Sequence, residues 1–370
     1  MNIVVNAVLA FSEPRGVGRY INNLLPALAE IDKENNYYIY YGKWMKKYSF
    51  LTIQQENFKF IELDIKNSQI SRNLFLAINL PLMSKKYKPD IYFLIDTQAT
   101  FVKPCKTVSV IHDLAEFQMP DKYSKKQAAI RKFIVKNQIR LSDKIITVSK
   151  YSQNDICRRF GLPKDRVHVI YNALAEMHAI KELQKPENYF LFVSEVEKAK
   201  NLQIMIEAFA QLPQKYRDLY EIRVVGKKGN NFEEIQKLIE NRKLKEKVHF
   251  YGYVTDEELK DIYSKAYAFV FPSLFEGFGL PVLEAMGNGV PVLCSNAASI
   301  PEVGGEAVLT FNPYKADELC GQMINVIENK EVRQKMIQDG LQRASMFTTS
   351  RCANETLEVF KEIGEKDAKI

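Results

Sequence analysis

The sequence predicts an α/β protein built from two doubly wound, parallel-sheet domains that face a cleft. Its 370 residues are roughly twice the usual length of one domain. Short apolar runs alternate with amphipathic stretches along the chain, which is typical of parallel sheets with helices on both faces. A polar stretch near 173–188 separates two such halves and is the expected linker.

The first half contains seven expected strands, each a mainly apolar run of five to seven residues, which is short for a helix. They cover 2–8, 37–41, 58–63, 90–95, 106–111, 144–148 and 167–171. A helix is expected over 18–31, because apolar residues recur at helical spacing from Ile21 to Ile31. Residues 1–175 therefore form the expected N-terminal domain.

The second half repeats this order. Its expected strands cover 189–194, 221–226, 247–251, 267–271, 290–294 and 307–310. A helix is expected over 201–212, with Asn201 as its N-cap residue. Residues 186–349 form the expected C-terminal domain. The last helix, at about 349–364, could pack on either domain, and we assign the segment 350–370 to the first.

Cysteine usage and hydropathy indicate a protein of a reducing cytosol. The cysteines are odd in number and none forms a C-x-x-C pair, which argues against a disulfide framework and a zinc site. They are Cys105, Cys157, Cys294, Cys320 and Cys352. The first residues predict a strand rather than a signal peptide, and no run of about 18 apolar residues occurs. We expect a cytoplasmic protein, with peripheral contact to the inner face of the cell membrane as an open option.

Positive charge is concentrated in the first half of the chain. The formal charge is +7, and residues 1–180 carry 27 Lys and Arg against 16 Asp and Glu. A basic half fits an anionic partner such as lipid, a phosphate-bearing acceptor or nucleic acid, and equally fits a solvated surface. Because no groove-reading motif is present, nucleic acid is not an expected partner.

The stretch from Lys122 to Lys144 is basic and has helical spacing. Four basic side chains share one face of the expected helix, and three apolar side chains share another. The basic residues are Lys125, Lys132, Lys136 and Arg140, and the apolar residues are Ile130, Phe133 and Ile134. The pattern fits either a helix that touches an anionic lipid surface or an ordinary helix with a solvated face over a core.

The most informative segment is an apolar strand that leads into an acid and a glycine-rich turn. After the strand come Glu276, Gly277, Phe278, Gly279 and Leu280. Two glycines let the backbone approach a ligand closely and present its N–H groups. Pro281 suits the first position of a helix, whose positive end would then face a phosphate.

The two acids of this segment, Glu276 and Glu284, are suited to different tasks. A carboxylate accepts several hydrogen bonds, so Glu276 in the turn could bind sugar hydroxyls. Glu284, expected in the first turn of the helix, could bind a ribose diol. The alternative is that Glu276 is a surface turn acid and that Glu284 only complements the helix dipole.

The segment 272–309, PSLFEGFGLPVLEAMGNGVPVLCSNAASIPEVGGEAVL, resembles the E-x7-E segment of retaining glycosyltransferases of family 4, which have the GT-B fold. Similar segments cover nearly the whole chain in the family's order: GVGRYINNLL, VIHDLAEFQMPDKYS, SDKIITVSKYSQNDI, VIYNA, FLFVSEVEKAKNLQIMIEAF, VVGKKG and FYGYVTDEELKDIYSKAYAFVFPSLFEGFGLP. The resemblance implies two Rossmann-like domains, of which the second holds a nucleotide-sugar donor and the first holds most of the acceptor site.

The resemblance also assigns residues of the first domain to the donor. Gly16 and Gly18 open the first helix, and the family similarity implies that they face the donor phosphates. His112 follows the strand 106–111, and the similarity implies that it contacts the donor sugar. A plain loop and a histidine satisfied inside a turn are the respective alternatives. The remaining histidines, His168, His178 and His249, are expected to be structural or solvated.

Lys200 lies where similar enzymes use a lysine to hold the leaving phosphates, next to the start of a helix. Here the chain departs from the family. Ser194 and Glu195 stand where the family often has Gly followed by Arg, Ser or Thr. Ser194 is still assigned to the donor site, but Glu195 would repel a diphosphate unless it turned away or paired with Lys198 or Arg15.

Three further positions resemble family residues beside the nucleotide. They are Gly226, Lys227 and Val254, and each could equally belong to a plain turn. No D-x-D pair occurs in the sequence, so no metal ligand is assigned. The resemblance therefore favours a reaction that needs no metal and no cofactor, because the nucleotide sugar is itself a substrate.

The similarity is most marked to mannosyl- and rhamnosyltransferases of bacterial surface-polysaccharide assembly. It favours GDP-mannose as donor and a glycan or lipid-linked saccharide as acceptor. Catalytic roles are assigned to His112, Lys200 and Glu276, with no enzymatic nucleophile, because the resemblance implies front-face attack by the acceptor and retention of configuration. Two alternatives stay open: a nucleotide-sugar epimerase on the same fold, and a non-catalytic scaffold that binds nucleotide sugars.

Overall fold

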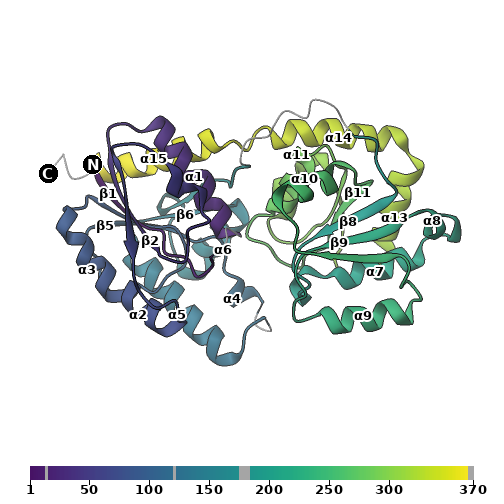
Figure 1. The fold of residues 1–370 in the computed structure, drawn as a ribbon, viewed down its shortest axis with the longest axis horizontal. Coiled ribbons are helices and arrows are strands. Elements are labelled where there is room, and N and C mark those ends of the chain that lie inside the picture. Colours follow the sequence, from purple (N-terminus) through teal and green to yellow (C-terminus); the bar gives the residue numbers. More distant parts are fainter. Residues whose placement is uncertain (13–15, 120–121, 175–183, 366–370) are drawn as a thin grey trace. The chain divides into compact units, whose positions relative to one another are not determined.

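The computed structural model of the protein describes residues 1–12, 16–119, 122–174 and 184–365. Arg15, His178 and most of the expected linker lie outside these residues. The chain divides into two compact units (Figure 1). Unit 1 contains Met1–Ala175 and Phe347–Ile370, and unit 2 contains Glu176–Met346.

Unit 1 is built on a seven-stranded sheet in which every pair of neighbours is parallel. The strands are β1 (Asn2–Asn6), β2 (Asn36–Gly42), β3 (Phe58–Leu63), β4 (Ile91–Leu94), β5 (Lys106–Val110), β6 (Lys144–Thr147) and β7 (Val167–Val169). Their order is β3-β2-β1-β4-β5-β6-β7. The order reverses between β1 and β4, and the carboxyl ends of strands at such a switch point are the usual place for a ligand.

Helices cover the unit 1 sheet and bury their apolar sides on it. They are α1 (Val17–Ile31), α2 (Gln69–Leu74), α3 (Leu80–Ser84), α4 (Ala115–Gln118), α5 (Lys125–Leu141), α6 (Lys150–Phe160) and α15 (Thr349–Glu365). A π-helical segment, η2 (Phe75–Asn79), joins α2 to α3, and the 3₁₀ helices are η1 (Ser49–Thr52), η3 (Lys85–Tyr87) and η5 (Lys164–Arg166). Although α15 is last in the sequence, it packs beside α1. Its Phe360 is fully buried, and the ring lies edge-on to Phe93 of β4 with 5.0 Å between centroids.

Unit 2 repeats the plan with six parallel strands. They are β8 (Tyr189–Val193), β9 (Glu221–Val225), β10 (Val248–Gly252), β11 (Ala268–Phe271), β12 (Val292–Ser295) and β13 (Leu309–Phe311), in the order β10-β9-β8-β11-β12-β13. The helices are α7 (Leu202–Gln211), α8 (Gln214–Leu219), α9 (Phe232–Asn241), α10 (Asp256–Ser264), α11 (Leu280–Gly287), α12 (Ile300–Gly304), α13 (Ala316–Glu328) and α14 (Lys330–Ala344), with short turns η6 (Lys198–Lys200) and η7 (Gly305–Ala307).

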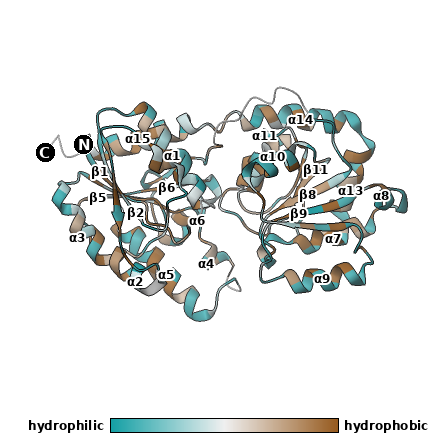
Figure 2. Ribbon diagram, in the orientation of Figure 1, coloured by the Kyte–Doolittle hydropathy of each residue, from teal (hydrophilic) through white to brown (hydrophobic). Residues whose placement is uncertain are grey.

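The predicted α/β class, with two Rossmann-like parallel sheets, is confirmed. Every expected apolar run contains a strand, because strands buried on both faces of a parallel sheet must be apolar along their length. Figure 2 shows α7 and α9 with alternating brown and teal bands, as expected for helices that bury one side. In the part of the chain that is described, no helix is both long and apolar enough to cross a bilayer.

Candidate active site

The carboxyl ends of three adjacent strands of unit 2 are tied together through their backbones. After β8, the N–H of Ser194 donates to Val225 O at 2.9 Å, and the N–H of Gly226 donates to Gly252 O at 2.8 Å. Gly226 has φ 141°, and a Cβ added there would lie 2.0 Å from the Ser194 carbonyl oxygen. Glycine is therefore required at 226, where two chain segments approach each other closely.

Lys200 and Glu276 meet in an ion pair at this edge of the sheet. The Lys200 Nζ lies 2.6 Å from Glu276 Oε1, and the two side chains are 22% and 16% exposed. Partial burial strengthens the attraction between them relative to a surface pair. An ammonium group has three donors, so Lys200 can bind a carboxylate and a phosphate oxygen at the same time.

Backbone and amide contacts fix the loops that carry this pair. The N–H of Leu274 donates to Ala199 O at 2.9 Å, which joins the loop after β11 to η6. The Asn201 side-chain amide donates to Pro272 O at 3.2 Å and Pro313 O at 2.7 Å. Asn201 is the N-cap residue of α7, as predicted, but its side chain forms no capping hydrogen bond, because its backbone is left-handed (φ 56°) and its amide is turned to these two carbonyl groups.

The buried Ser299 contacts the backbone of the glycine-rich turn. The Ser299 hydroxyl lies 2.9 Å from Glu276 O and 2.8 Å from Phe278 O, so two carbonyl groups of the turn face the interior. Gly279 has φ 120°, a conformation that favours glycine. The helix α11 begins at Leu280, directly after the turn, so its positive end lies at the turn.

Glu284 lies further along α11 than expected. The helix starts at Leu280, so Pro281 is its second residue and Glu284 its fifth, beyond the first turn. Glu284 therefore lies just beyond the first turn, where the effect of the helix dipole falls off. The buried Tyr263 donates a hydrogen bond from its hydroxyl to Glu284 Oε2 at 3.4 Å.

The remaining assigned residues of unit 2 lie in ordinary turns. Lys227 is exposed after β9, and its carbonyl accepts from Val196 N at 3.0 Å. Val254 follows β10 and directly precedes Thr255, which caps α10. These contacts are compatible with a nucleotide-binding edge and with plain turns alike.

Glu195 and Lys198, which could have paired with each other, have other neighbours. Glu195 is exposed, and its Cγ lies 3.0 Å from where a Cβ on Gly229 would be. Lys198 forms an ion pair with Glu234 at 3.1 Å. Glu195 is thus directed along the loop after β9, whose close backbone approach requires a glycine at 229.

In unit 1, Gly16 and Gly18 form the beginning of α1. Gly16 has φ 45°, and its carbonyl accepts hydrogen bonds from Arg19 N at 3.0 Å and Tyr20 N at 3.2 Å. Gly18 is buried in the first turn of the helix. The positive φ of Gly16 explains why a glycine precedes the helix.

His112 lies two residues beyond β5, at the carboxyl edge of the unit 1 sheet. Its Nε2 is 3.2 Å from Ile95 O, and its ring is edge-on to Tyr20 of α1 with 5.1 Å between centroids. Because a carbonyl oxygen only accepts, this contact favours the tautomer with the proton on Nε2. The ends of β4, β5 and α1 therefore meet at His112.

Sequence reasoning missed three polar residues that shape these sites. Asp96 lies two residues beyond β4, where burial raises its pKa and the nearby His112 acts in the opposite direction. An acid at the carboxyl end of a buried strand is a signal that could have identified it. Ser299 and Tyr263 have no such signal, because their roles depend on contacts with distant parts of the chain.

The structure brings several assigned residues together and separates others. Lys200 contacts Glu276, and Ser194 contacts Gly226, whereas Glu284 pairs with Tyr263. Within the described ranges, no three His, Cys, Asp or Glu side chains are grouped as ligands for a metal ion.

Comparison with known proteins decides the family. The model for Glycosyltransferase Family 4 matches residues 14–175, and the model for Glycosyl transferases group 1 matches residues 175–343. The O-antigen chain mannosyltransferase B of Escherichia coli is 30% identical over 267 residues, which cover 69% of this chain and 70% of that protein. This chain is a family 4 glycosyltransferase.

A further relative supports the family, and solved structures share the fold. The O-antigen chain mannosyltransferase RfbU of Salmonella typhimurium is 32% identical over 203 residues, 55% of this chain and 56% of that protein. Sucrose-phosphate synthase of Thermosynechococcus elongatus shares the fold, with a TM-score of 0.75 and 19% identity over 98% of both chains. Anabaena Alr3699/HepE, solved with UDP-glucose, has a TM-score of 0.72 at 17% identity over 98% of this chain and 100% of that one. The predicted GT-B fold and transferase class are confirmed.

Proposed function

We propose that this glycosyltransferase moves a mannosyl group from GDP-mannose to a hydroxyl of a glycan or lipid-linked saccharide in surface-polysaccharide assembly. Support for the sugar comes from the two O-antigen mannosyltransferases to which the chain is similar. The observation that carries the chemistry is the Lys200–Glu276 pair beside the glycine-rich turn. It brings a cation for phosphate and an acceptor for sugar hydroxyls to one place.

Each side chain has a role in this proposal. Lys200 and the positive end of α11 stabilise the departing diphosphate, so charge develops where donors are already in position. Glu276 and the backbone of the turn from Gly277 to Leu280 orient the sugar. Glu284 holds the ribose diol, with Tyr263 fixing the carboxylate.

Unit 1 contributes its own groups under the same proposal. His112 steadies the donor sugar, and the beginning of α1 at Gly16 and Gly18 contacts the phosphates. The acceptor hydroxyl attacks the front face of the sugar, so configuration is retained and no protein nucleophile is required. Charge stabilisation by Lys200 and helix ends takes the place of a metal ion.

Donor binding is tested first by thermal shift. The protein is heated with GDP-mannose and with UDP-, dTDP- and ADP-sugars. A ligand at 100 times its Kd stabilises the protein by about 2.7 kcal/mol, which raises Tm by about 5–11 °C for units of this size, at about 2–4 °C per kcal/mol. GDP-mannose is expected to give the largest shift, and another donor giving it would replace the proposed sugar nucleotide.

Transfer is then measured with and without acceptor, and with and without EDTA. Mannose is expected to move only when acceptor is present, and EDTA is expected to leave the rate unchanged. Conversion of the donor without acceptor would instead identify an epimerase, and loss of activity in EDTA would contradict the metal-independent mechanism. The variant Lys245→Ala is the control, since it changes an exposed side chain shortly before β10 begins, whereas the proposed site lies at the carboxyl ends of the strands.

A further inference from the structure

Unit 1 exposes apolar side chains along the helical segment from α2 to α3. Leu74 is 61% exposed, Ile78 is 36% exposed and Leu82 is 48% exposed. Their spacing of four residues places them on one side of the rod formed by α2, η2 and α3. The opposite side, with Leu76, Ala77 and Leu80, is buried.

A second exposed apolar patch lies on α5. Ile130 is 46% exposed and Phe133 is 58% exposed, whereas Ala128, Val135 and Ile139 face the core. Ile130 and Phe133 therefore do not belong to the buried face with which α5 packs on the core. These two apolar side chains lie on the outward face of α5, and its packing on the core uses other residues.

Phe101 joins the two patches into one surface. Its N–H donates to Ala77 O at 2.9 Å, so it lies alongside η2. Its ring centroid is 6.1 Å from that of Phe133, and its side chain is 45% exposed. The side chain of Asn137 on α5 also donates to Thr100 O, which holds the loop against the helix. We call the exposed side chains Leu74, Ile78, Leu82, Phe101, Ile130 and Phe133 the α2–α5 surface (α2 and α5 are labelled in Figure 1).

The segments that build this surface contain no acidic residue. Residues 65–89, 97–112 and 122–142 hold fourteen Lys and Arg and neither Asp nor Glu. The flanking positions do carry acids, namely Asp64, Asp90, Asp96, Asp113, Asp121 and Asp143, and Glu116 lies nearby in the sequence. Of these, Glu116 lies 4.0 Å from Arg131, and Asp143 lies 2.8 Å from Lys103. The basic half of the sequence thus concentrates its charge around exposed apolar side chains.

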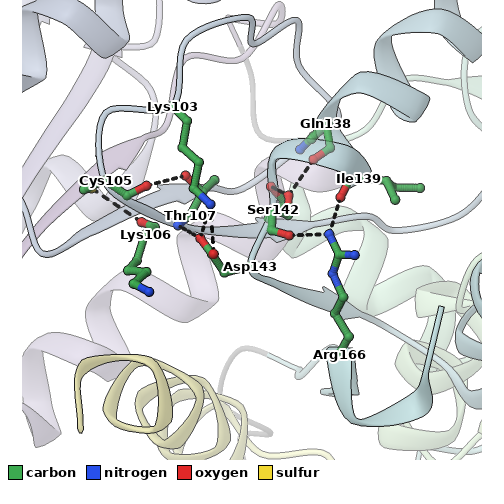
Figure 3. A network of polar contacts seen from close by, with 10 residues as sticks. Lys103, Cys105, Lys106, Thr107, Gln138, Ile139, Ser142, Asp143 and Arg166 are labelled. Atoms are coloured by element: carbon green, nitrogen blue, oxygen red, sulfur yellow. Dashed lines mark hydrogen bonds and ion pairs between the residues drawn. The ribbon is translucent and has the colours of Figure 1, made fainter. Parts of the chain in front are cut away.

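Polar contacts hold α5 in place at both ends. At its beginning, Ser124 and Gln127 form a reciprocal capping box. At its end, Arg166 donates to Ile139 O and Ser142 O, and the Ser142 hydroxyl donates to Gln138 O at 2.7 Å (Figure 3). The exposed side chains therefore belong to a fixed helix and not to a frayed end.

We propose that the α2–α5 surface docks unit 1 on an anionic lipid bilayer. Apolar side chains ringed by Lys and Arg match an interface that offers hydrocarbon beneath negatively charged headgroups. Lys126, Lys136 and Arg140 share the outward side of α5 with Ile130 and Phe133, so the charges and the apolar groups reach the membrane together. The docking itself does not depend on the proposed function. Its purpose rests on that function, because docking would bring the enzyme to a lipid-linked acceptor.

Vesicle co-sedimentation tests the proposal without substrate. The full chain is mixed with vesicles of phosphatidylcholine and phosphatidylglycerol, or of phosphatidylcholine alone. We expect binding to the anionic vesicles to be at least about tenfold tighter, and to weaken as salt screens the charges. Equal binding to both vesicles, or none to either, overturns the proposal.

Surface variants then locate the contact. Ile130→Ser/Phe133→Ser and Lys126→Glu/Lys136→Glu are each expected to weaken vesicle binding about tenfold or more. The controls Leu219→Ser and Lys245→Glu/Lys260→Glu change exposed residues of unit 2 and are expected to bind like the wild type. Unchanged circular dichroism and Tm show that the variants fold. If the surface variants bind as tightly as the wild type, the α2–α5 surface is not the docking face.

This result is separable from the enzymatic proposal. With a short water-soluble acceptor, Ile130→Ser/Phe133→Ser is expected to keep its transfer rate while losing vesicle binding. If the surface variants lose vesicle binding but the wild type shows no transfer from GDP-mannose, the proposed donor is rejected and the docking surface is supported. If the wild type transfers mannose and the surface variants still bind vesicles like the wild type, the docking surface is rejected and the proposed enzymatic function is supported.

Discussion

The ammonium nitrogen of Lys200 lies 2.6 Å from a carboxylate oxygen of Glu276, although the two residues are 76 positions apart in the chain. One follows β8 and the other follows β11, which are neighbours in the sheet. Adjacent strand ends thus bring opposite charges together at the edge where ligands of such folds bind. Anything that binds there must exchange contacts with this pair.

The pair should therefore act as a unit. Lys200→Ala and Glu276→Ala are each expected to lower kcat by about 10²–10³-fold, because each removes a group that stabilises or orients the reacting centre. The double variant should lose less than the two single losses combined, since residues in contact are coupled. Steady-state kinetics with the best donor measure this. Single variants within twofold of the wild type would remove both residues from the site.

Glu284 is expected to act on donor affinity. Glu284→Ala should raise the donor KM about tenfold with little change in kcat, as expected when binding to a part of the substrate remote from the reaction is lost. Tyr263→Phe should have a smaller effect in the same direction, because it removes only the hydrogen bond that fixes the carboxylate. The wild type should bind a donor with 2′-deoxyribose less tightly than the full donor. Glu284→Ala should bind the two donors equally tightly. An undiminished preference in Glu284→Ala would show that this carboxylate does not contact the ribose.

Gly226 should tolerate no side chain. A Cβ at 226 would lie 2.0 Å from Ser194 O, and φ is 141°, so Gly226→Ala forces two backbone segments apart. We expect unit 2 to lose about 3 kcal/mol of unfolding free energy or more, measured by urea denaturation. Gly321→Ala is the matched control. It lies within α13 with open space at the Cβ position, so it should gain up to about 1 kcal/mol.

The stability of unit 1 should depend on pH through His168. Burial, and then the charge of Lys144, lowers the pKa of His168 in the folded protein. The unfolded chain therefore takes up a proton as pH falls through about 6.5 while the folded protein does not, so unfolding becomes easier on the acidic side.

His168→Gln should flatten this dependence between about pH 7.5 and pH 5, as followed by urea unfolding with fluorescence detection. The lower limit stays above the ordinary pKa of aspartate, about 3.8, so that Asp32, whose pKa is lowered on folding, does not contribute. An identical slope in the wild type and in His168→Gln would contradict the assignment to this side chain.

Much of the fold could be predicted because its physical causes are local. Strands buried on both faces need continuous apolar runs, and helices between them need an apolar stripe, so both appear in the sequence. The glycine-rich turn could be found for the same reason, since Gly279 has a φ of 120° that few other residues adopt. His112 could be placed by its position directly after a strand.

The errors concern features that depend on tertiary contacts. Asn201 sits at the expected position, but its amide donates to Pro272 and Pro313, which lie far along the chain. Glu284 was placed one residue too early in α11, because a helix that begins at Leu280 cannot be distinguished by spacing from one that begins at Pro281. The exposure of Phe133 was hidden as well, because periodicity shows that a helix has two faces and does not say which one packs.

The packing of α15 against α1 has a consequence for biosynthesis. Unit 1 contains Met1–Ala175 together with Phe347–Ile370, and its core includes the fully buried Phe360. During synthesis, the strands of unit 1 are made first, but the core of unit 1 still lacks Phe360 of α15. All of unit 2 has been made once Met346 is added. The core of unit 1 therefore cannot be completed until the whole of unit 2 and then α15 have been synthesised, so the part of the chain that is made first waits for the last helix.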